Sequence, residues 1–425
     1  MERGIIQVEN QSWTPKEKGF DHTLGVMREG YMYIPNRMQS FQTDIFKTRL
    51  LGEQVICLSG KEAAELFYDI DKFKRHKAAP KKAMKTLFGQ GGLQTLDGVK
   101  HQHRKEMFMS LMSNERLNKL KAITEKHWEQ ALHAWTGKGK IQLYDEAKEM
   151  MTRIASEWAG LPAPDDKFEE HVKKVSSLFE SPTKLGLKYK KAVNHRKELE
   201  QWIRGLITQV RDGKMHPETG SALDVISWHR DLNENLLDSQ TAAVEIVNIL
   251  RPIVAISIYI NFTALAVYQF PNETVKLVSG NEQLMQQFVQ EVRRFYPFFP
   301  FLPARVKQDF TWKNHTFPKG TLTLLDLYGT NHDPKYWDNP NLFKPDRFAD
   351  WSGSPFDFIP QGGGDYWMGH RCPGEWMTVD VMKVALDYLV NKMDYTVPKQ
   401  DLSYRLVHMP SIPPSHVILE NIQRK

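Results

Sequence analysis

Cysteine is scarce in this sequence. Only Cys57 and Cys372 occur among the 425 residues, too few for a disulfide framework, an all-cysteine zinc site or an iron–sulfur cluster. The first residues, MERGIIQVENQSW, also lack the basic segment and apolar core of a signal peptide. Both absences favour the reducing cytoplasm as the location of the protein.

Long hydrophobic runs are rare as well. One run, residues 253–270, approaches the length of a membrane span, and Ser257, Asn261 and Thr263 interrupt it. A helix that is apolar all round lies either in lipid or in the middle of a large protein. Because nothing else in the sequence is typical of a membrane protein, we interpret this run as a buried core helix and expect no membrane span.

A strong excess of charge of one sign is missing too. The 57 Lys and Arg residues outnumber the 51 Asp and Glu residues, which gives a formal net charge of +6. Two basic clusters, residues 71–85 and 183–198, could contact nucleic acid. Since no nucleic-acid-binding module or zinc-finger spacing accompanies them, a solvated surface is favoured, and we expect no nucleic-acid partner.

The chain also lacks internal repeats, low-complexity stretches and long linkers, so a single domain over residues 1–425 is expected. Apolar residues recur at helical spacing in several segments. They predict helices at 114–136, 145–160, 188–211, 239–270, 281–296 and 375–393. Strand-like segments are shorter and lie near the two ends, at 46–51, 54–60, 304–312 and 321–328. The predicted fold class is therefore mainly α with a minor β-sheet.

Cys372 has a sequence environment that suggests chemistry. A glycine run, residues 362–364, precedes it, and Pro373 suits the first position of the helix that follows. A helix amino terminus together with His370 and Arg371 favours a thiolate, and Gly374 leaves room for a flat ligand. These residues alone leave a nucleophile, a redox sensor, an iron ligand and an ordinary packed cysteine as alternatives.

Two further features lie upstream of Cys372. Glu291 and Arg294 are three positions apart on one helical face, and acid–base pairs at this spacing are usually exposed ion pairs that contribute little to stability. Arg347 lies in the proline-rich segment NPNLFKPDRF. Neither feature proves a function by itself.

The order of these features resembles the cytochrome P-450 superfamily over most of the chain: Glu291-x-x-Arg294, then Lys344-Pro-Asp-Arg347-Phe, then Cys372-Pro-Gly374 at the start of a helix. The resemblance implies one haem domain, in which Cys372 is the axial ligand of haem b iron. It also implies that Glu291, Arg294 and Arg347 bind one another behind the haem. The cysteine loop departs from the usual pattern, because Asp365 and Met368 replace a phenylalanine and a glycine.

The central helix points to one branch of that superfamily. Residues 248–257 read NILRPIVAIS, without the acid–alcohol pair that delivers protons in most such oxygenases. Arg251 and Pro252, and also residues 92–112, resemble the bacterial fatty-acid peroxygenases and their decarboxylating relatives. The resemblance implies that Arg251 holds the substrate carboxylate, and that hydrogen peroxide replaces dioxygen and any redox partner. Pro252 should kink or widen the helix.

Several other residues are assigned by the same resemblance. Gln94 matches a pocket position that is Gln or His in this branch, so hydroxylation at the alpha and beta carbons is expected, with decarboxylation as a minor path. Phe88, Phe298 and Phe301 are expected to line the alkyl channel, although ordinary core aromatics remain an alternative. The candidates for contact with the haem propionates are His101, Lys105, Arg305 and His370.

Three alternatives remain open at this point. The first is a reductase-dependent monooxygenase of the same fold. The second is a non-catalytic haem or fatty-acid sensor, and the third is a helical protein without a cofactor. For Arg251 itself, an ordinary structural ion pair, for instance with Glu245 or with another acid, is the competing interpretation.

Overall fold

The computed structural model describes residues 14–162, 167–182, 184, 186–278 and 280–425. Helices make up most of it. The α-helices are α1 (Thr23–Glu29), α2 (Tyr33–Phe41), α3 (Lys61–Phe67), α4 (Lys81–Ala83), α5 (Gly98–Ser110), α6 (Asn114–Trp135), α7 (Leu143–Ala159), α8 (Phe168–Glu180), α9 (Gly186–Arg211), α10 (Ala222–Trp228), α11 (Ser239–Gln269), α12 (Pro271–Thr274), α13 (Glu282–Phe295), α14 (Leu327–Asn331) and α15 (Glu375–Asp387). Two π-helical turns, η2 (Met84–Phe88) and η7 (Tyr388–Lys392), follow α4 and α15.

The strands form one larger sheet and two small ones. They are β1 (Ile45–Leu50), β2 (Glu53–Leu58), β3 (Phe73–Lys74), β4 (Lys140–Gln142), β5 (Phe301–Val306), β6 (Phe310–Trp312), β7 (His315–Phe317), β8 (Leu322–Asp326), β9 (Met393–Thr396) and β10 (Ile418–Arg424). The larger sheet has the order β1-β2-β8-β5-β3, with β2 and β8 parallel. It therefore joins the two strand-rich ends of the chain, and the predicted fold class is confirmed.

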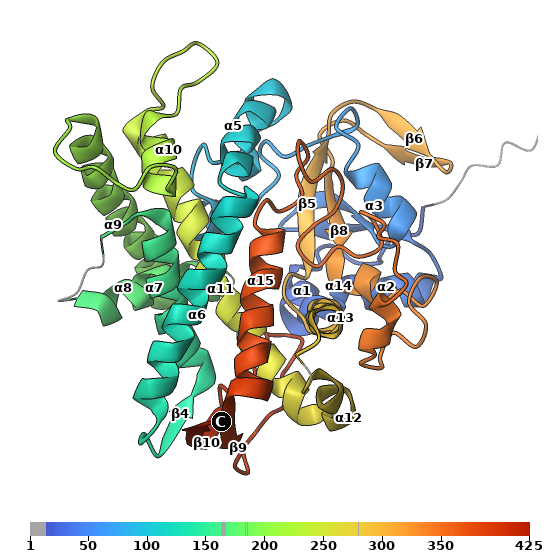
Figure 1. Ribbon diagram of the computed structural model, residues 1–425. Helices are drawn as coiled ribbons and strands as arrows, with labels where there is room; N and C mark the ends of the chain where they lie inside the picture. The colour runs from blue at the N-terminus through green and yellow to red at the C-terminus, as the bar shows by residue number, and fades with distance from the viewer. Residues whose placement is uncertain (1–13, 163–166, 183, 185, 279) are drawn as a thin grey trace, which may run out of the picture.

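The helices and the larger sheet lie side by side. Figure 1 shows most helices on the left and in the centre, and β5 and β8 on the right. Side chains alternate between the two faces of a strand. In β2, Ile56 and Leu58 pack in one hydrophobic cluster and Val55 and Cys57 in another. A third and larger cluster fills the helical region.

Helix α11 is the centre of the helical region. It packs against α7, α9 and α15 and runs behind α6 and α15 in Figure 1. It is long and apolar enough to cross a membrane, but 94% of its most apolar window is buried inside the protein. The run at 253–270 is therefore part of a core helix, as its sequence indicated. The α-helix continues through Pro252 without a π-helical turn, and the kink expected there stays a prediction.

The helix boundaries agree with the sequence pattern except near Cys372. Helix α6 begins at Asn114, where the Ser113 side chain accepts a hydrogen bond from the Arg116 backbone N–H. Helix α15, in contrast, begins at Glu375 with Gly374 as its N-cap. Pro373 is therefore not the first helical residue, whereas the range 375–393 predicted from apolar spacing starts where α15 does and ends after the π-helical turn η7.

Candidate active site

Cys372 lies in the loop just before α15 and is a free thiol with partial exposure. Burial raises the pKa of this thiol, the Glu375 carboxylate raises it further, and the Lys105 ammonium opposes the rise. Arg371 was expected to stabilise the thiolate by its charge, but its Nε donates to Glu375 Oε2 at 2.6 Å instead. The protein alone therefore does not favour the thiolate, which is a correction to the sequence-based expectation.

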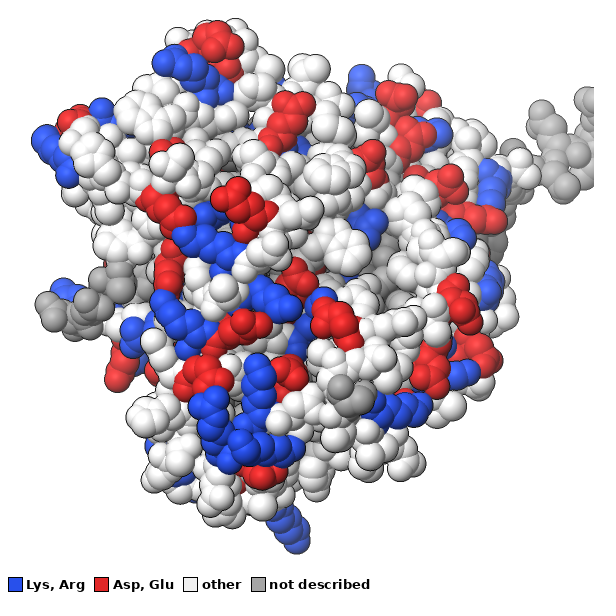
Figure 2. All heavy atoms as spheres, viewed as in Figure 1, with Lys and Arg blue, Asp and Glu red and all other residues white. Residues whose placement is uncertain are grey.

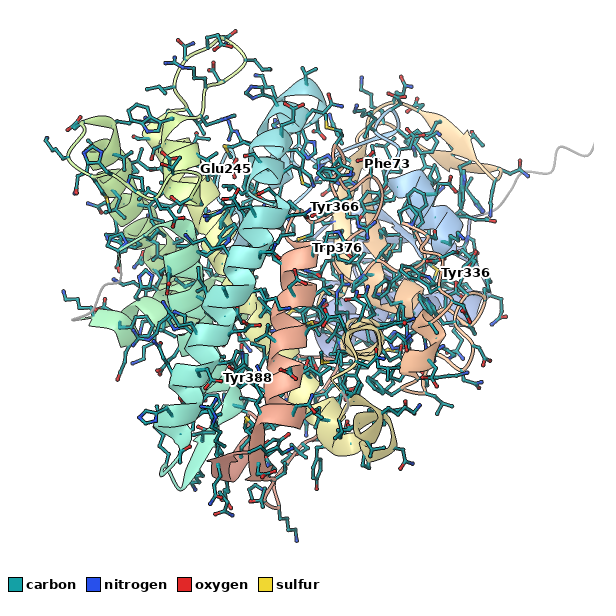
Figure 3. The ribbon with its side chains drawn as sticks, in the orientation of Figure 1. Phe73, Glu245, Tyr336, Tyr366, Trp376 and Tyr388 are labelled. Carbon is teal, nitrogen blue, oxygen red and sulfur yellow. The ribbon has the colours of Figure 1, made fainter. Side chains whose placement is uncertain are left out.

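The glycine run positions this loop by close packing. A Cβ atom on Gly363 would lie 2.3 Å from the carbonyl oxygen of Pro355, and one on Gly364 would lie 3.0 Å from the Tyr68 ring. On the other side, the Tyr366 hydroxyl donates to the carbonyl oxygen of Pro373 at 2.8 Å. Figure 3 shows Tyr366 near the start of α15. The backbone on both sides of Cys372 is thereby fixed.

A buried ion pair connects α13 to the start of α15. Arg293 Nη2 donates to Glu375 Oε1 at 2.7 Å, and both side chains are almost completely buried. Burial acts against ionisation of Glu375, but Arg293 and Arg371 outweigh it and hold the pKa of this carboxyl below its usual value. The sequence analysis missed Arg293, although it stands directly beside Arg294.

Glu291, Arg294 and Arg347 meet as their resemblance implied. Arg294 donates from Nε and Nη2 to the two oxygens of Glu291 at 2.7 and 2.8 Å. Arg347 Nε lies 3.1 Å from Glu291 Oε2, and the backbone N–H of Lys344 donates to Oε1 at 2.8 Å. Because the Glu291 carboxylate is fully buried, these donors replace the water it has lost.

Arg251 is buried without a counter-ion among the residues that the structure describes. Its exposed fraction is 6%, and its Nε has no hydrogen-bond partner there. Burial lowers the pKa of Arg251 to about 9, and the charge of Arg196 lowers it further, while Cys372 opposes the shift. A guanidinium in this position leaves donors open for an anion.

Glu245 does not supply that anion. Its Oε1 accepts hydrogen bonds from Arg104 Nη1 at 2.7 Å and from the backbone N–H of Leu93 at 2.9 Å. Figure 3 shows Glu245 on the part of α11 near α5, which carries Arg104. The interpretation of Arg251 as an ion-pair partner of Glu245 is therefore wrong.

Gln94 is held against α11 one turn before Arg251. Asn248 Nδ2 donates to Gln94 Oε1 at 3.1 Å and to Glu245 Oε2 at 3.3 Å, and Asn248 Oδ1 accepts from Arg196 Nη2 at 3.4 Å. The loop that contains Gly92 and Gln94 approaches α11 so closely that a Cβ on Gly92 would lie 2.5 Å from Asn248 Nδ2. Asn248 had no assigned role in the sequence analysis.

Two of the propionate candidates contact each other. The rings of His101 and His370 have centroids 3.9 Å apart. Burial lowers the pKa of His101 to about 4, and it lowers that of His370 well below its usual value, with the charge of Arg75 adding to both shifts. Arg75 is buried, and burial lowers its pKa to about 10. The sequence analysis missed Arg75, which belongs to a basic run without a helical pattern.

The other two propionate candidates differ in position: Lys105 lies beside His101 and His370, whose pKa values its charge lowers, and Arg305 does not. Lys105 Nζ donates to the carbonyl oxygen of Arg371 at 2.5 Å, and burial lowers the pKa of Lys105 to about 8. Arg305 pairs with Glu53 and donates to the carbonyl oxygens of Lys77 and Gly320. The structure therefore does not bring Arg305 into the cluster of His101 and His370.

The three candidates for the alkyl channel pack in two different hydrophobic clusters. Phe88 and Phe298 pack against the large helical cluster, and the Phe298 ring stacks on Tyr259 of α11 with centroids 4.3 Å apart. Phe301 instead packs in the cluster of the larger sheet, with Phe46 as one of its members. Phe301 therefore packs in a different cluster from Phe88 and Phe298, and its place in the alkyl channel stays a prediction.

Three solved structures are similar to the chain over nearly its whole length. Cytochrome P-450EX alpha (CYP152N1) with myristic acid is 49% identical with a TM-score of 0.94, covering 97% of this chain and 100% of that one. A variant of cytochrome P-450SP alpha (CYP152B1) is 43% identical with a TM-score of 0.93, covering 96% and 100%. A variant of cytochrome P-450 OleT in complex with arachidonic acid is 37% identical with a TM-score of 0.93, covering 97% and 99%. The chain belongs to the cytochrome P-450 superfamily.

More distant relatives agree with this assignment. The cytochrome P-450 family model matches residues 281–414. An abscisic acid 8'-hydroxylase of Solanum lycopersicum is 24% identical over 394 residues, which covers 86% of this chain and 81% of that protein. The beta-amyrin 6-beta-monooxygenase of the same species is 22% identical over 416 residues, covering 89% and 85%. Within the cytochrome P-450 superfamily, the chain lies in the branch of the CYP152 enzymes.

Members of the cytochrome P-450 superfamily use haem b, and the residues present fit that group. Cys372 offers a free thiol in a fixed loop, and bound iron would deprotonate it despite its raised pKa. Buried Arg75 and His101 and the half-buried His370 lie together, and their guanidinium and imidazole N–H groups suit the propionate carboxylates. The chain is accordingly a haem-thiolate oxidoreductase.

Proposed function

We propose that this enzyme uses hydrogen peroxide to hydroxylate medium- to long-chain fatty acids at the alpha and beta carbons, with decarboxylation to terminal alkenes as a minor path. The buried, unpaired guanidinium of Arg251 carries the proposal. A fatty acid is an anion with an apolar tail, so its carboxylate satisfies Arg251 while its chain packs against apolar side chains. The similar structures with myristic acid and arachidonic acid hold ligands of this class.

The proposed chemistry needs an acid–base group beside the haem. When bound, the haem supplies the oxidising centre through its thiolate-ligated iron. Arg251 holds the substrate carboxylate by charge and by paired N–H donors. That carboxylate can take a proton from hydrogen peroxide and return it to the departing oxygen atom. The substrate thus provides the catalyst that α11 lacks, so no redox partner is required.

The residues around Arg251 have proposed supporting roles. Pro252 has no backbone N–H, so the carbonyl oxygen of Asn248 loses its helical donor beside the pocket. Gln94, held by Asn248 at 3.1 Å, keeps the pocket wall polar but cannot titrate. Phe88 and Phe298 would contact the alkyl chain. We propose Cys372 as the iron ligand and Arg75, His101 and His370 as the propionate contacts, in a protein that works in the cytoplasm.

Product analysis tests the proposal. Haem-loaded protein is mixed with myristic acid and hydrogen peroxide, without reductase or nicotinamide, and the products are identified by mass spectrometry. We expect 2- and 3-hydroxymyristic acid as the main products and a smaller amount of the one-carbon-shorter alkene. Myristyl alcohol, which has no carboxylate, serves as the control and should not react. A normal thiolate-haem spectrum without product would contradict the peroxide-dependent reaction.

A further inference from the structure

The two basic clusters of the sequence meet on one surface. Helix α4 lies against the first turns of α9, where the Lys82 ammonium is 5.5 Å from the centre of the Tyr189 ring. Arg196 of α9 fixes the segment that follows α4, because its Nη1 donates to the carbonyl oxygens of Thr86 and Leu87 at 2.9 and 3.1 Å. We define the lysine surface as six exposed residues of these elements: Lys81, Lys82, Lys85, Lys188, Lys190 and Lys191.

The charge of the lysine surface is not compensated locally. Residues 72–96 and 181–197 contain no Asp or Glu. The acids just beyond the second segment have other partners: Glu198 pairs with Lys174 at 2.9 Å and Glu200 with Arg196 at 2.6 Å. In contrast, positive and negative side chains alternate over the face formed by α5, α6 and α15 (Figure 2). The lysine surface therefore attracts anions more strongly than a surface of mixed charge.

An apolar side chain accompanies the lysines. Leu187, in the first turn of α9, is 83% exposed, and its neighbours Gly186 and Lys188 face water as well. An exposed leucine surrounded by lysines is typical of segments that lie at a lipid interface, where the apolar side chain enters the headgroup region. Nucleic acid offers negative charge as well, but it gives Leu187 no apolar partner. The lysine surface therefore fits a lipid bilayer better than a nucleic acid.

The lysine surface also lies beside the proposed alkyl channel. Lys85 and Phe88 are three positions apart in the π-helical turn η2, and Lys85 faces solvent while Phe88 packs against the helical core. Contact of this surface with a bilayer would place the outer side of the channel wall against the lipids, where fatty acids partition. We propose that the lysine surface docks the enzyme on a bilayer that contains anionic lipids, with Leu187 inserted between the headgroups.

Sedimentation with lipid vesicles tests this proposal directly. We expect the haem-loaded protein to bind vesicles of phosphatidylglycerol and phosphatidylcholine, and not vesicles of phosphatidylcholine alone. Raising the salt from about 0.1 M to about 0.5 M should release it, because charge interactions are screened. The triple variant Lys82→Gln, Lys188→Gln, Lys191→Gln should bind at least about tenfold more weakly. Leu187→Ser should weaken binding while leaving its salt dependence unchanged.

A matched variant separates the lysine surface from overall charge. Lys121, Lys319 and Lys399 are also exposed but lie outside α4, η2 and α9, and their replacement by Gln removes the same total charge. This control should bind anionic vesicles as the unmodified protein does. Equal losses in both triple variants would overturn the proposal, and so would tighter binding of a DNA duplex than of vesicles. Arg251→Leu should leave vesicle binding unchanged, which distinguishes failure of this proposal from failure of the proposed reaction.

Discussion

Glu245 is bound by Arg104 and not by Arg251, although Glu245 and Arg251 are both buried on the same helix. The Arg104 Nη1 atom lies 2.7 Å from Glu245 Oε1, while Arg251 Nε has no partner among the described residues. Burial raises the pKa of Glu245, and Arg104 limits that rise. The carboxylate of α11 is thereby kept away from Arg251, which remains available for an anionic ligand.

Arg251→Leu should separate activity from stability. We expect kcat/KM for fatty acids to fall by roughly 100-fold, because a charge-assisted hydrogen bond to the substrate is lost. The free energy of unfolding should stay unchanged or rise by about 1 kcal/mol, since an uncompensated buried charge is replaced by an apolar side chain. Product analysis and urea unfolding measure the two effects.

The haem spectrum is the control for that variant. The Arg251→Leu protein should keep the absorption of a thiolate-bound haem, because Arg251 is not a ligand of the iron. Undiminished turnover of myristic acid in this variant would show that another group holds the substrate carboxylate.

Glu245→Gln should destabilise the protein. It leaves the Arg104 guanidinium buried opposite a neutral amide, and loss of one partner from a buried pair costs about 3–5 kcal/mol. The double variant Arg104→Met, Glu245→Gln should recover part of this loss because no uncompensated charge remains. Urea unfolding of the two single variants and the double variant gives the coupling energy. Additive single effects would contradict a direct interaction between the two side chains.

Most of the helical framework could be predicted from the sequence, because apolar spacing over long segments is a local signal. Helices α6 and α11 agree with their predicted ranges to within a residue at each end. For α15, apolar spacing gave the correct start at residue 375, whereas the local preference of Pro373 for a first helical position did not, because the loop around Cys372 extends to Gly374. The packing of Gly363 and Gly364 against Tyr68, which helps to fix this loop, is non-local.

The candidate site was predictable only where several motifs occur in a fixed order. Glu291, Arg294 and Arg347 were found in this way. Arg75 and Asn248 were missed, because their importance depends on burial and on partners distant in the sequence. The cluster in which Phe301 packs could not be predicted for a related reason: its face of the sheet follows from the register of β5 with β8, which the sequence alone does not specify.

Glu291→Gln should weaken the region behind the proposed haem site. The amide keeps one oxygen acceptor but loses the charge that Arg294 and Arg347 share, so we expect the free energy of unfolding to fall by about 3 kcal/mol. Haem content after purification should fall as well. The exposed pair of Glu169 and Lys173 offers a control, since Glu169→Gln should change neither quantity. Full haem content and unchanged stability in Glu291→Gln would contradict a structural role for this cluster.

His171 should make the stability of the protein depend on pH. Burial lowers the pKa of His171 from 6.5 to about 4, so the unfolded chain binds a proton that the folded protein does not bind between these values. The contribution of neutral His171 to the free energy of unfolding is therefore fully present above about pH 6.5 and is lost as the pH falls towards 4. Between pH 7.5 and pH 5 we expect His171 to account for a loss of about 2 kcal/mol. In urea unfolding, His171→Phe should reduce the decline, whereas replacement of the exposed His76 by Phe should not.

Gln94→His should raise the share of terminal alkene among the products. Gln94 Oε1 accepts a hydrogen bond from Asn248 at 3.1 Å, and one nitrogen of a neutral imidazole can accept the same bond. The second nitrogen would then bring a proton donor that titrates near neutral pH into the pocket, which the amide cannot do. We therefore expect the alkene share of this variant to change between about pH 5.5 and pH 7.5, and that of the unmodified enzyme to stay constant. Gas chromatography of the myristic acid products measures both shares. A product ratio that is unaffected by the substitution and by pH would show that the position of the alkyl chain, and not the side chain at residue 94, decides between hydroxylation and decarboxylation.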